Sequence, residues 1–406
     1  MFKVDVDDKK IEELLVRRIQ EDIGKNYIFP SKTEAEKRLK EGKPLRVYLG
    51  IDPTGPNLHV GHTVPLFFLK SLQDMGHKPV ILIGDFTACI GDPTGKDKIR
   101  KPLSEDQVKG NMKKYLEQIG KILDLAKVEV FYNSRWLKKM SLEEIVKLSS
   151  NFTVQQMLDR DMFQRRQEEQ KPIGIHEFLY PLMQGYDSVA MEIDGEVGGS
   201  DQIFNMLVGR DLEKIYLQKD KLVFATRLLV NKETGEKMSK TEGNLISLSD
   251  SPKDLFGKIM HTVPDSMIYT FFELVTDLPW ENLREKRNEI QSQPRKYKEE
   301  LAYQLVKIYH GKDKAEKVRE EFIAVYQRGE KPEDIVEIAI DLAKMNPVDL
   351  LLKLGIDSKS EAKRLIEQGA VDINDSKLDN WQDEVLIKNG TIIKLGAYRF
   401  FKLIVR

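Results

Sequence analysis

Apolar residues gather in short runs that alternate with amphipathic segments over the first part of the chain. The runs at 46–51, 79–84 and 127–132 are short, which predicts buried strands rather than helices. Between them, 61–75 has apolar residues at helical spacing, and 104–123 opens with a serine, a residue type that caps helices. This alternation predicts an α/β fold with a doubly wound parallel sheet.

The middle of the chain predicts more helix than strand. Residues 141–190 are largely helical in pattern, with an interruption by Lys-Pro-Ile-Gly at 171–174. The segment 191–199 is short and rich in glycine, 201–217 predicts another helix, and 222–230 predicts a return to strand. A turn-like segment follows.

The last third of the chain changes character near its end. From 251 to about 345 the pattern is helical and highly charged, and Asn346-Pro347 predicts a break. The residues after it predict two short helices and several strands, which together would make a small α+β unit.

Two predicted connections lie where such sheets bind ligands. The turn after Ile51 and the loop 85–101 both follow strands of the predicted parallel sheet. Ligands of doubly wound sheets bind outside the carboxyl ends of the strands. We therefore expect the functional site at this edge.

Composition narrows the class of protein. The chain has 406 residues, which favours two or three domains, and a net charge of -1, so any RNA site must be a local basic patch. Cys89 is the single cysteine, which excludes a disulfide framework and a cysteine-rich metal site and fits a reducing compartment. Residues 1–18 resemble neither a signal peptide nor a membrane anchor, so we expect a cytoplasmic protein.

The first chemical motif is His59-Val-Gly-His62, between a predicted strand and helix. Two imidazoles and a glycine at a helix N-terminus suit a polyphosphate, because the helix end is positive and offers free N–H groups. The alternative is an ordinary pair of turn histidines, but the position of the motif after a strand and Asp-Pro-Thr favours the functional interpretation.

The second motif is Lys237-Met-Ser-Lys240, between Gly235 and Gly243. Two ammonium groups on a glycine-flanked loop can close over the charge of a transferring phosphate. Alone, the string could equally be a solvated basic turn. The two motifs together resemble the signatures of class I aminoacyl-tRNA synthetases, with Thr241 where serine is common.

Further strings narrow the resemblance to tyrosyl-tRNA synthetases over nearly the whole chain. They are Tyr48-Leu-Gly-Ile-Asp52-Pro-Thr54, Ile90-Gly-Asp92-Pro-Thr-Gly-Lys96, Tyr180-Pro-Leu-Met-Gln184-Gly-Tyr-Asp187 and Gly198-Gly-Ser-Asp201-Gln202. The chain looks most like the bacterial subgroup with a Lys-Met-Ser-Lys loop. The resemblance implies a tyrosine–tRNA ligase that uses ATP, L-tyrosine and tRNA(Tyr), and a homodimer.

The spacing of polar residues between Tyr180 and Asp187 is informative independently of the resemblance. Tyr180, Gln184 and Asp187 lie on one face of a helix, where a buried Asp can accept a hydrogen bond from a phenol. Tyr48 can supply a second contact to the same hydroxyl. The alternative is an ordinary core stripe with one buried acid. By resemblance, Tyr180, Gln184 and Asp92 would hold the substrate ammonium, and Gln202 would lie near the reacting carboxylate.

The remaining roles are also implied by the resemblance. His59 and Thr54 would contact the departing polyphosphate, His62 would support the adenosine, and Lys237 and Lys240 would close over the phosphates. The ATP-binding positions would be Gly50, Asp52, Gly61, Gly199, Asp201 and Lys240. Lys96 and Arg100 would be either extra phosphate contacts or solvated loop residues. Mg²⁺ would accompany ATP, because no dedicated metal-ligand cluster is visible.

The end of the chain resembles the small RNA-binding domain of ribosomal small-subunit protein four. Lys359, Lys363 and Arg364 are the candidate phosphate contacts, on a helix opened by a capping box at Ser358.

The patterns and the resemblance together predict three domains. We expect a Rossmann-like catalytic domain at 1–230 with a helical insertion at about 133–185. A helical anticodon-side domain at 231–340 and the RNA-binding domain at 345–406 would follow.

Three rival interpretations remain at this point. A small-molecule adenylating ligase would share His-x-Gly-His but lack the RNA-binding tail. A tryptophanyl enzyme would share the fold, but the acid facing a phenol-sized slot favours tyrosine. A non-catalytic RNA-binding scaffold would be expected to lose Lys240 or His59, and both are present.

Overall fold

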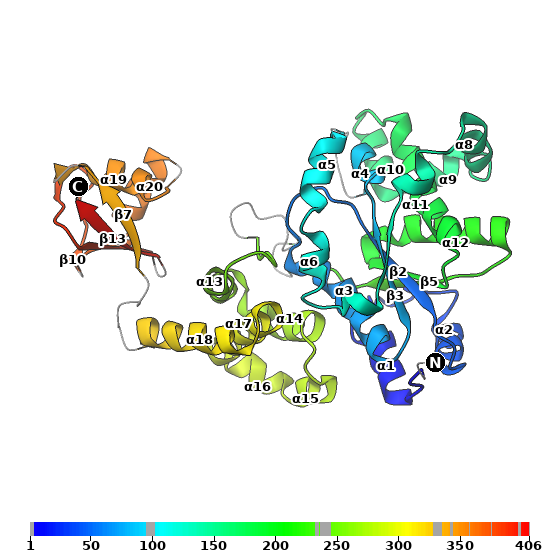
Figure 1. Cartoon of the computed structure of the whole chain (residues 1–406), viewed down its shortest axis with the longest axis horizontal. Coiled ribbons are helices and arrows are strands. Elements are labelled where there is room, and N and C mark those ends of the chain that lie inside the picture. The colour runs from blue at the N-terminus through cyan, green and yellow to red at the C-terminus, as the bar shows by residue number, and fades with distance from the viewer. Residues whose placement is uncertain are drawn as a thin grey trace. The chain divides into compact units, whose positions relative to one another are not determined.

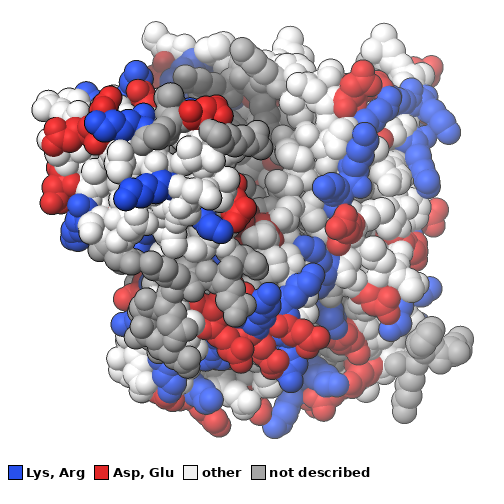
Figure 2. Space-filling model, turned by 60° about the vertical axis from the view of Figure 1, so that its left-hand side comes forward, with Lys and Arg blue, Asp and Glu red and all other residues white. Residues whose placement is uncertain are grey.

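A computed structural model of the chain describes residues 4–94, 102–231, 235, 245–327, 335–341, 344–356, 358–374, 376–396 and 399–405. Within it the chain forms two compact units, Met1–Ala315 and Glu316–Arg406 (Figure 1). Lys237 and Lys240 of the basic loop, and Lys96 and Arg100, lie outside the described residues. Acidic and basic side chains are mixed over the face drawn in Figure 2, as the balanced net charge leads one to expect.

A six-stranded sheet forms the centre of the first unit, in the order β1-β6-β5-β2-β3-β4. All neighbouring strands run parallel except β1, which pairs antiparallel with β6 at one edge. The strands are β1 (Ile28–Phe29), β2 (Arg46–Ile51), β3 (Lys78–Ile83), β4 (Glu129–Tyr132), β5 (Gly195–Gly199) and β6 (Leu222–Thr226). This architecture confirms the predicted α/β class with a doubly wound sheet.

The strand order reverses between β2 and β5. From β2 the chain proceeds to β3 and β4 on one side, whereas β5 and β6 extend the sheet on the other side. The first helix after each of these central strands therefore begins at the same edge of the sheet, and a crevice opens between them. In Figure 1, α3 (Val60–Asp74) lies on the opposite side of the strands from α11 (Ile175–Met191) and α12 (Ile203–Leu217).

Helices α11 and α12 pack unusually closely because glycines face each other. A Cβ atom at Gly185 would lie 2.8 Å from the Leu212 side chain and 3.1 Å from the backbone nitrogen of Gly209. At 2.8 Å the Leu212 side chain would have to move, and the 3.1 Å contact with the backbone is also tighter than usual. This contact sets how α11 lies over the sheet, and α11 carries three of the predicted tyrosine-binding residues.

The other helices before α12 connect the strands or cover them. Those of the first half are α1 (Asp8–Val16), α2 (Lys32–Lys40), α4 (Thr87–Ile90), α5 (Glu105–Met112) and α6 (Tyr115–Ile119). Between β4 and α11 lie α7 (Ser134–Leu137), α8 (Leu142–Ser149), α9 (Val154–Leu158) and α10 (Asp161–Glu168). The predicted interruption at 171–174 falls between α10 and α11.

A helical region follows β6, as predicted. Its helices are α13 (Pro252–Thr262), α14 (Ile268–Val275), α15 (Trp280–Glu285), α16 (Arg287–Ser292), α17 (Pro294–His310) and α18 (Lys312–Gln327). Arg17 and Arg18 hold α14 to the N-terminal segment. Their buried guanidinium groups donate to carbonyl oxygens between Phe272 and Leu278, including Thr276 at 2.6 Å from Arg18. These bonds satisfy the carbonyl groups left free at the C-terminal end of α14.

The second unit is a small α+β structure with its own apolar core. Five strands lie in the order β10-β9-β12-β13-β7, and two more pair as β11-β8. The unit begins within α18. Its further elements are β7 (Val336–Ile340), β8 (Lys344–Met345), α19 (Pro347–Lys353), α20 (Lys359–Glu367), β9 (Val371–Ile373), β10 (Ser376–Lys377), β11 (Val385–Leu386), β12 (Thr391–Leu395) and β13 (Arg399–Val405). The core is built from residues such as Leu350, Ile366 and Leu403.

Three element predictions were wrong. The helical pattern expected to about 345 ends earlier, because Ile338 and Ile340 alternate with polar or small neighbours and pack into the core of the second unit. The helix expected over 104–123 is broken into α5 and α6. The glycine-rich segment 191–199, for which no strand was predicted, contains the central strand β5, where Gly195 packs closely against Val47.

The described part of the chain contains no helix that is both long and apolar enough to cross a membrane.

Candidate active site

A cavity of about 340 Å³ lies at the point where the strand order reverses. Every predicted catalytic, tyrosine-binding and ATP-binding residue that the structure describes lines it. These residues are Tyr48, Gly50, Asp52, Thr54, His59, Gly61, His62, Asp92, Tyr180, Gln184, Asp187, Gly199, Asp201 and Gln202. Residues separated by up to 154 positions in the chain therefore converge on one site.

The two histidines of the first motif form the N-terminal end of α3. The His59 Nδ1 atom accepts from the Gly61 backbone N–H at 3.1 Å, and His62 Nδ1 accepts from the His59 backbone N–H at 3.1 Å. Their ring centroids lie 3.7 Å apart. Burial, with a smaller contribution from His59, lowers the pKa of His62 to about 3. His62 is therefore a neutral imidazole at physiological pH.

The loop after β2 is held by the broken helix α5–α6. Asn111 donates to the Pro53 carbonyl at 2.9 Å, and the Tyr115 hydroxyl donates to the Gly55 carbonyl at 2.7 Å. These two contacts hold the loop that carries Thr54 to the cavity.

Tyr48 and Asp187 lie at the deep end of the cavity. Tyr48 is fully buried on β2, and Asp187 is 2% exposed on α11. Asp187 accepts from Trp136 Nε1 at 2.7 Å and from Asn133 Nδ2 at 3.2 Å. Burial raises the pKa of the Asp187 carboxyl well above its usual value, and these two N–H donors oppose that shift. A polar, nearly dry pair of this kind suits a phenolic hydroxyl.

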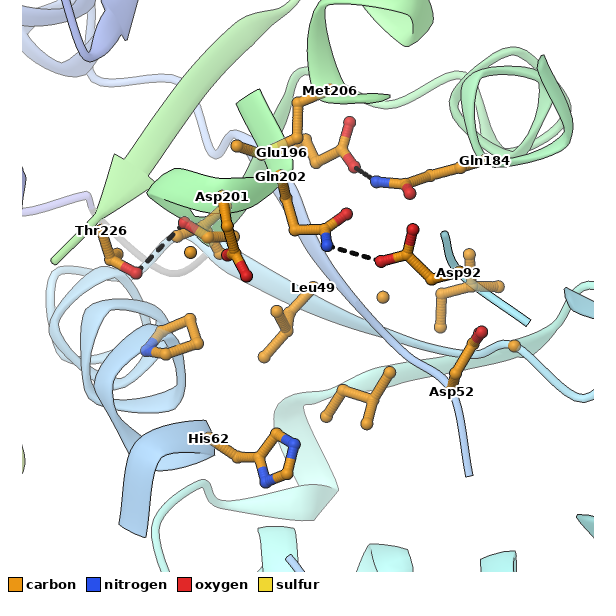
Figure 3. Close-up of a pocket in the computed structure, with 18 of the residues that line it drawn as sticks. Leu49, Asp52, His62, Asp92, Gln184, Glu196, Asp201, Gln202, Met206 and Thr226 are labelled. Carbon is orange, nitrogen blue, oxygen red and sulfur yellow. Dashed lines mark hydrogen bonds between the residues drawn. The ribbon is translucent and has the colours of Figure 1, made fainter. Parts of the chain in front are cut away.

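The residues predicted to hold an ammonium group each contact another polar side chain. Tyr180 donates its hydroxyl hydrogen to Asp52 at 2.7 Å, and Asp52 also accepts from Thr87 at 2.7 Å. Gln202 donates to Asp92 at 2.7 Å (Figure 3). Burial and the neighbouring carboxylates raise the pKa of Tyr180 well above its usual value, so it stays a neutral donor.

The lining carries much negative charge. Its carboxylates are Asp52, Asp92, Asp187, Glu196 and Asp201. Among the lining residues that the structure describes, Arg227 alone is a lysine or arginine, and it forms an ion pair with Glu273. Such a lining favours a cationic group and disfavours a triphosphate unless further cations enter.

Several residues that shape the site were missed in the sequence. Asn133 and Trp136 follow directly after β4, so their position at the carboxyl end of a strand could have signalled them. Ser188, Glu196 and Lys221 form a buried group beneath the cavity. Lys221 gave no signal, because a lysine beside a predicted strand is usually solvated.

The predicted RNA-binding residues lie together on α20 of the second unit. Lys359 and Arg364 have side chains that are 72% and 64% exposed, and each has an acidic neighbour, Asp349 at 3.7 Å and Glu361 at 3.6 Å. The Lys363 Nζ atom lies 3.7 Å from the centroid of the Trp381 ring. Ser358 caps this helix by accepting from the Glu361 backbone N–H, which confirms the N-cap half of the predicted capping box.

Residues 40–327 match the family of tRNA synthetases class I (W and Y). The chain is 43% identical over 412 residues to a tyrosine–tRNA ligase of Carboxydothermus hydrogenoformans, covering 98% of this chain and 99% of that protein. It is also 43% identical over 371 residues to a tyrosine–tRNA ligase of Moorella thermoacetica, covering 90% of each.

Solved structures resemble it as well. A C-terminally truncated mitochondrial tyrosyl-tRNA synthetase of Aspergillus nidulans matches with a TM-score of 0.65 and 26% identity, over 78% of this chain and 94% of that chain. A tyrosyl-tRNA synthetase of Archaeoglobus fulgidus, complexed with L-tyrosine, shares the fold at a TM-score of 0.58 and 20% identity, over 78% of this chain and 99% of that chain. With these similarities over nearly its whole length, and with the cavity at the switch point of its sheet, the chain belongs to the tyrosine–tRNA ligases of the class I tRNA synthetases.

Proposed function

We propose that this tyrosine–tRNA ligase performs both steps of its reaction in the cavity between β2 and β5. In the first step the tyrosine carboxylate attacks the α-phosphorus of ATP, pyrophosphate leaves, and tyrosyl-adenylate forms. In the second, a ribose hydroxyl of the terminal adenosine of tRNA(Tyr) attacks the tyrosyl carbonyl carbon and AMP leaves. The reaction needs no covalent enzyme intermediate, so the chain contributes positioning and charge stabilisation.

The observation that carries this proposal is the buried pair Tyr48 and Asp187 at the deep end of the cavity. We assign to them the hydroxyl of the substrate. Trp136 and Asn133 hold the Asp187 carboxylate in place by donating to its two oxygens. Phenylalanine entering the same slot would bring no hydroxyl, so it would forgo these hydrogen bonds and leave buried acceptor capacity unused.

The ammonium group of tyrosine is assigned to Asp92, Tyr180 and Gln184. The surplus of carboxylates among the lining residues supports this, because it favours a cation. Gln202 is assigned to the reacting carboxylate. Its amide is fixed at both ends, since Nε2 donates to Asp92 and Oε1 accepts from Asn205 at 2.9 Å.

ATP is assigned to the other end of the cavity. Thr54, His59 and the N-terminal N–H groups of α3 would contact the phosphates, because a helix N-terminus favours anions. A Cβ atom at Gly61 would lie 3.1 Å from the His59 ring, so a larger residue would crowd this end. Gly50, Asp52 and His62 would lie along the adenosine, with Gly199 and Asp201 near the ribose.

Mg²⁺ would enter with ATP as part of the substrate. Within the described residues, no group of three or more His, Cys, Asp and Glu is placed to hold it.

The positive charge that a triphosphate requires is assigned to Lys237 and Lys240. The segments on either side of their loop lie at the cavity. Leu228 and Leu229 line it, and Ser247 forms a β-bridge with His59. These anchors favour a loop that closes over the phosphates, as in the bacterial subgroup with a Lys-Met-Ser-Lys loop.

The remaining proposals concern the tRNA and the assembly. Lys359, Lys363 and Arg364 are assigned to tRNA phosphates. The surface ion pairs of Lys359 and Arg364 are weak and can exchange for phosphate, and Lys363 lies beside them on the same helix. We propose catalytic, anticodon-side and RNA-binding domains at 1–230, 231–340 and 345–406.

A cytoplasmic homodimer is proposed as the working form. Exposed apolar residues of the insertion, Leu142, Val146, Val154 and Ile175, support a partner surface there.

A two-stage experiment tests the proposed reaction. The protein is mixed with ATP and labelled tyrosine without tRNA, separated from small molecules, and then mixed with tRNA(Tyr). We expect labelled tyrosyl-adenylate to stay with the protein and then to transfer to tRNA with release of AMP. Retained label without transfer would contradict the second step, and no retained label would contradict the first.

A further inference from the structure

Lys221 is a buried lysine beneath the tyrosine-binding end of the cavity. It precedes β6 and its side chain is fully buried. Its ammonium group donates to Ser188 Oγ at 2.5 Å, forms an ion pair with Glu196, and lies 5.4 Å from the centroid of the Tyr48 ring. Burying an unpaired ammonium group costs a large desolvation free energy, so these contacts are needed to stabilise Lys221 in its buried position.

The surrounding helices leave room for this ammonium group. A Cβ atom at Gly209 of α12 would lie 2.5 Å from Lys221 Nζ and 2.9 Å from Ser188 Oγ. The glycine therefore makes the space that the cation occupies. Ser188 in turn shares a hydrogen bond of 3.1 Å with the Tyr48 hydroxyl, so the group extends to the cavity wall.

Glu196 connects Lys221 to the cavity. It lies on β5, is 2% exposed and lines the cavity. One carboxylate oxygen pairs with Lys221, and the other accepts from Gln184 Nε2 at 3.0 Å (Figure 3). Each oxygen thus has a different donor.

These contacts fix which way the Gln184 amide faces. A side-chain amide has one donor end and one acceptor end, whereas an ionised carboxylate only accepts. Glu196 must therefore face the Nε2 atom of Gln184, and Figure 3 shows Oε1 of Gln184 directed away from Glu196. An amide oxygen can accept a hydrogen bond from an ammonium group, whereas the amide nitrogen cannot.

We propose that Lys221 and Glu196 are positioning residues that set the polarity of Gln184, so that its oxygen meets the ammonium group of the substrate. The donor–acceptor order runs from Lys221 through Glu196 and Gln184 to the substrate. This inference rests on the proposed tyrosine-binding role of Gln184. It assigns to Glu196 and Lys221 a part in amino-acid recognition although neither is placed against the reacting atoms.

The test is Glu196→Gln. The introduced amide must turn its oxygen to Lys221, because the ammonium group only donates. Its NH₂ group then meets Nε2 of Gln184, so Gln184 must rotate and present a donor to the substrate ammonium. We expect the KM for tyrosine in ATP–pyrophosphate exchange to rise about 10- to 100-fold, with kcat and the KM for ATP little changed.

Two further measurements separate this role from a merely structural one. The first is inhibition by 3-(4-hydroxyphenyl)propanoate, which has the phenol and carboxylate but no ammonium group. Its inhibition constant should change far less than the tyrosine KM in Glu196→Gln, although Glu196 also interacts with the Tyr48 hydroxyl. The second is the exchanged pair Gln184→Glu/Glu196→Gln, which again turns an acceptor to the substrate and retains the total charge. It should restore the tyrosine KM, and it carries the test if the single variant does not fold.

Glu213→Gln is the matched control. Glu213 is a fully buried carboxylate on α12 near Lys221, but it does not line the cavity. The inference is overturned if Glu196→Gln leaves the tyrosine KM unchanged, if it weakens both ligands alike, if the exchanged pair fails to restore binding, or if Glu213→Gln has the same effect. If the unmodified protein shows no tyrosine-dependent exchange, the proposed function itself has failed.

Discussion

Replacing Asp187 by asparagine tests the selectivity pocket with almost no change in shape. Both Asp187 oxygens accept from N–H donors, Trp136 Nε1 at 2.7 Å and Asn133 Nδ2 at 3.2 Å. Asn133 cannot turn to adapt, because its oxygen accepts from the Phe86 backbone N–H at 2.9 Å and its nitrogen also donates to Thr87 at 3.0 Å. An asparagine offers one acceptor oxygen, so one donor loses its partner.

The size of the effect follows from these contacts. A buried donor left without a partner costs about 1–3 kcal/mol of the free energy of unfolding. A hydrogen bond from the phenol to the buried Asp187 carboxyl contributes about 0.5–3 kcal/mol, where the upper part of the range applies to an ionised acceptor, and this is about 2- to 150-fold in kcat/KM. The kcat/KM for tyrosine should fall by this factor. The value for phenylalanine should stay nearly constant, because phenylalanine has no hydroxyl to lose.

The assay is ATP–pyrophosphate exchange with tyrosine and with phenylalanine, on protein shown to be folded by circular dichroism. Asp85→Asn is the control, since Asp85 accepts from the Ser134 backbone N–H at 2.9 Å and from its hydroxyl at 2.6 Å but does not line the cavity. A folded Asp187→Asn variant that still discriminated as well as the unmodified protein would refute the assignment of Asp187 to the hydroxyl.

Further predictions concern the loop, the buried histidines and the second unit. Lys240→Ala should slow adenylate formation by about 10²- to 10³-fold while tyrosine still binds, measured by pyrophosphate release and equilibrium dialysis; unchanged release would exclude the role. Burial lowers the pKa of His62 to about 3 and of His77 to about 4, so the unfolded chain takes up protons below about pH 6.5 that the folded chain does not. The free energy of unfolding should therefore fall as the pH is lowered below about 6.5, by up to about 1.4 kcal/mol per pH unit for each histidine. Urea titrations at several pH values should show a smaller fall for the His77→Asn variant than for the unmodified protein. Lys363→Ala should weaken tRNA binding and reduce its salt slope by about 1, whereas an unchanged slope would exclude a phosphate contact.

The predictable part of the molecule is the part in which local pattern and tertiary structure agree. Strands β2, β3 and β4 are apolar runs bounded by turns, and the motif at His59 begins a helix where its glycine and its neighbours predict one. The residues assigned to the cavity were found because their strings resemble a family, and the structure brings all of those that it describes into one cavity.

The remaining part depends on contacts between distant segments. Strand β5 is rich in glycine because its neighbours pack closely, and a local pattern reads such glycines as a loop. Lys221 is buried only because Glu196, Ser188 and the space at Gly209 meet it from three other elements. The spacing of residues in the sequence does not predict these contacts.

ATP–pyrophosphate exchange driven by each standard amino acid in turn tests the central claim most directly, because exchange requires both activation chemistry and a matching pocket. We predict that tyrosine drives exchange and that phenylalanine and tryptophan do not. Exchange driven by tryptophan would agree with the fold and with the ATP end of the cavity, but it would contradict the assignment of Tyr48 and Asp187. If none of the amino acids drives exchange, the proposed first step is contradicted.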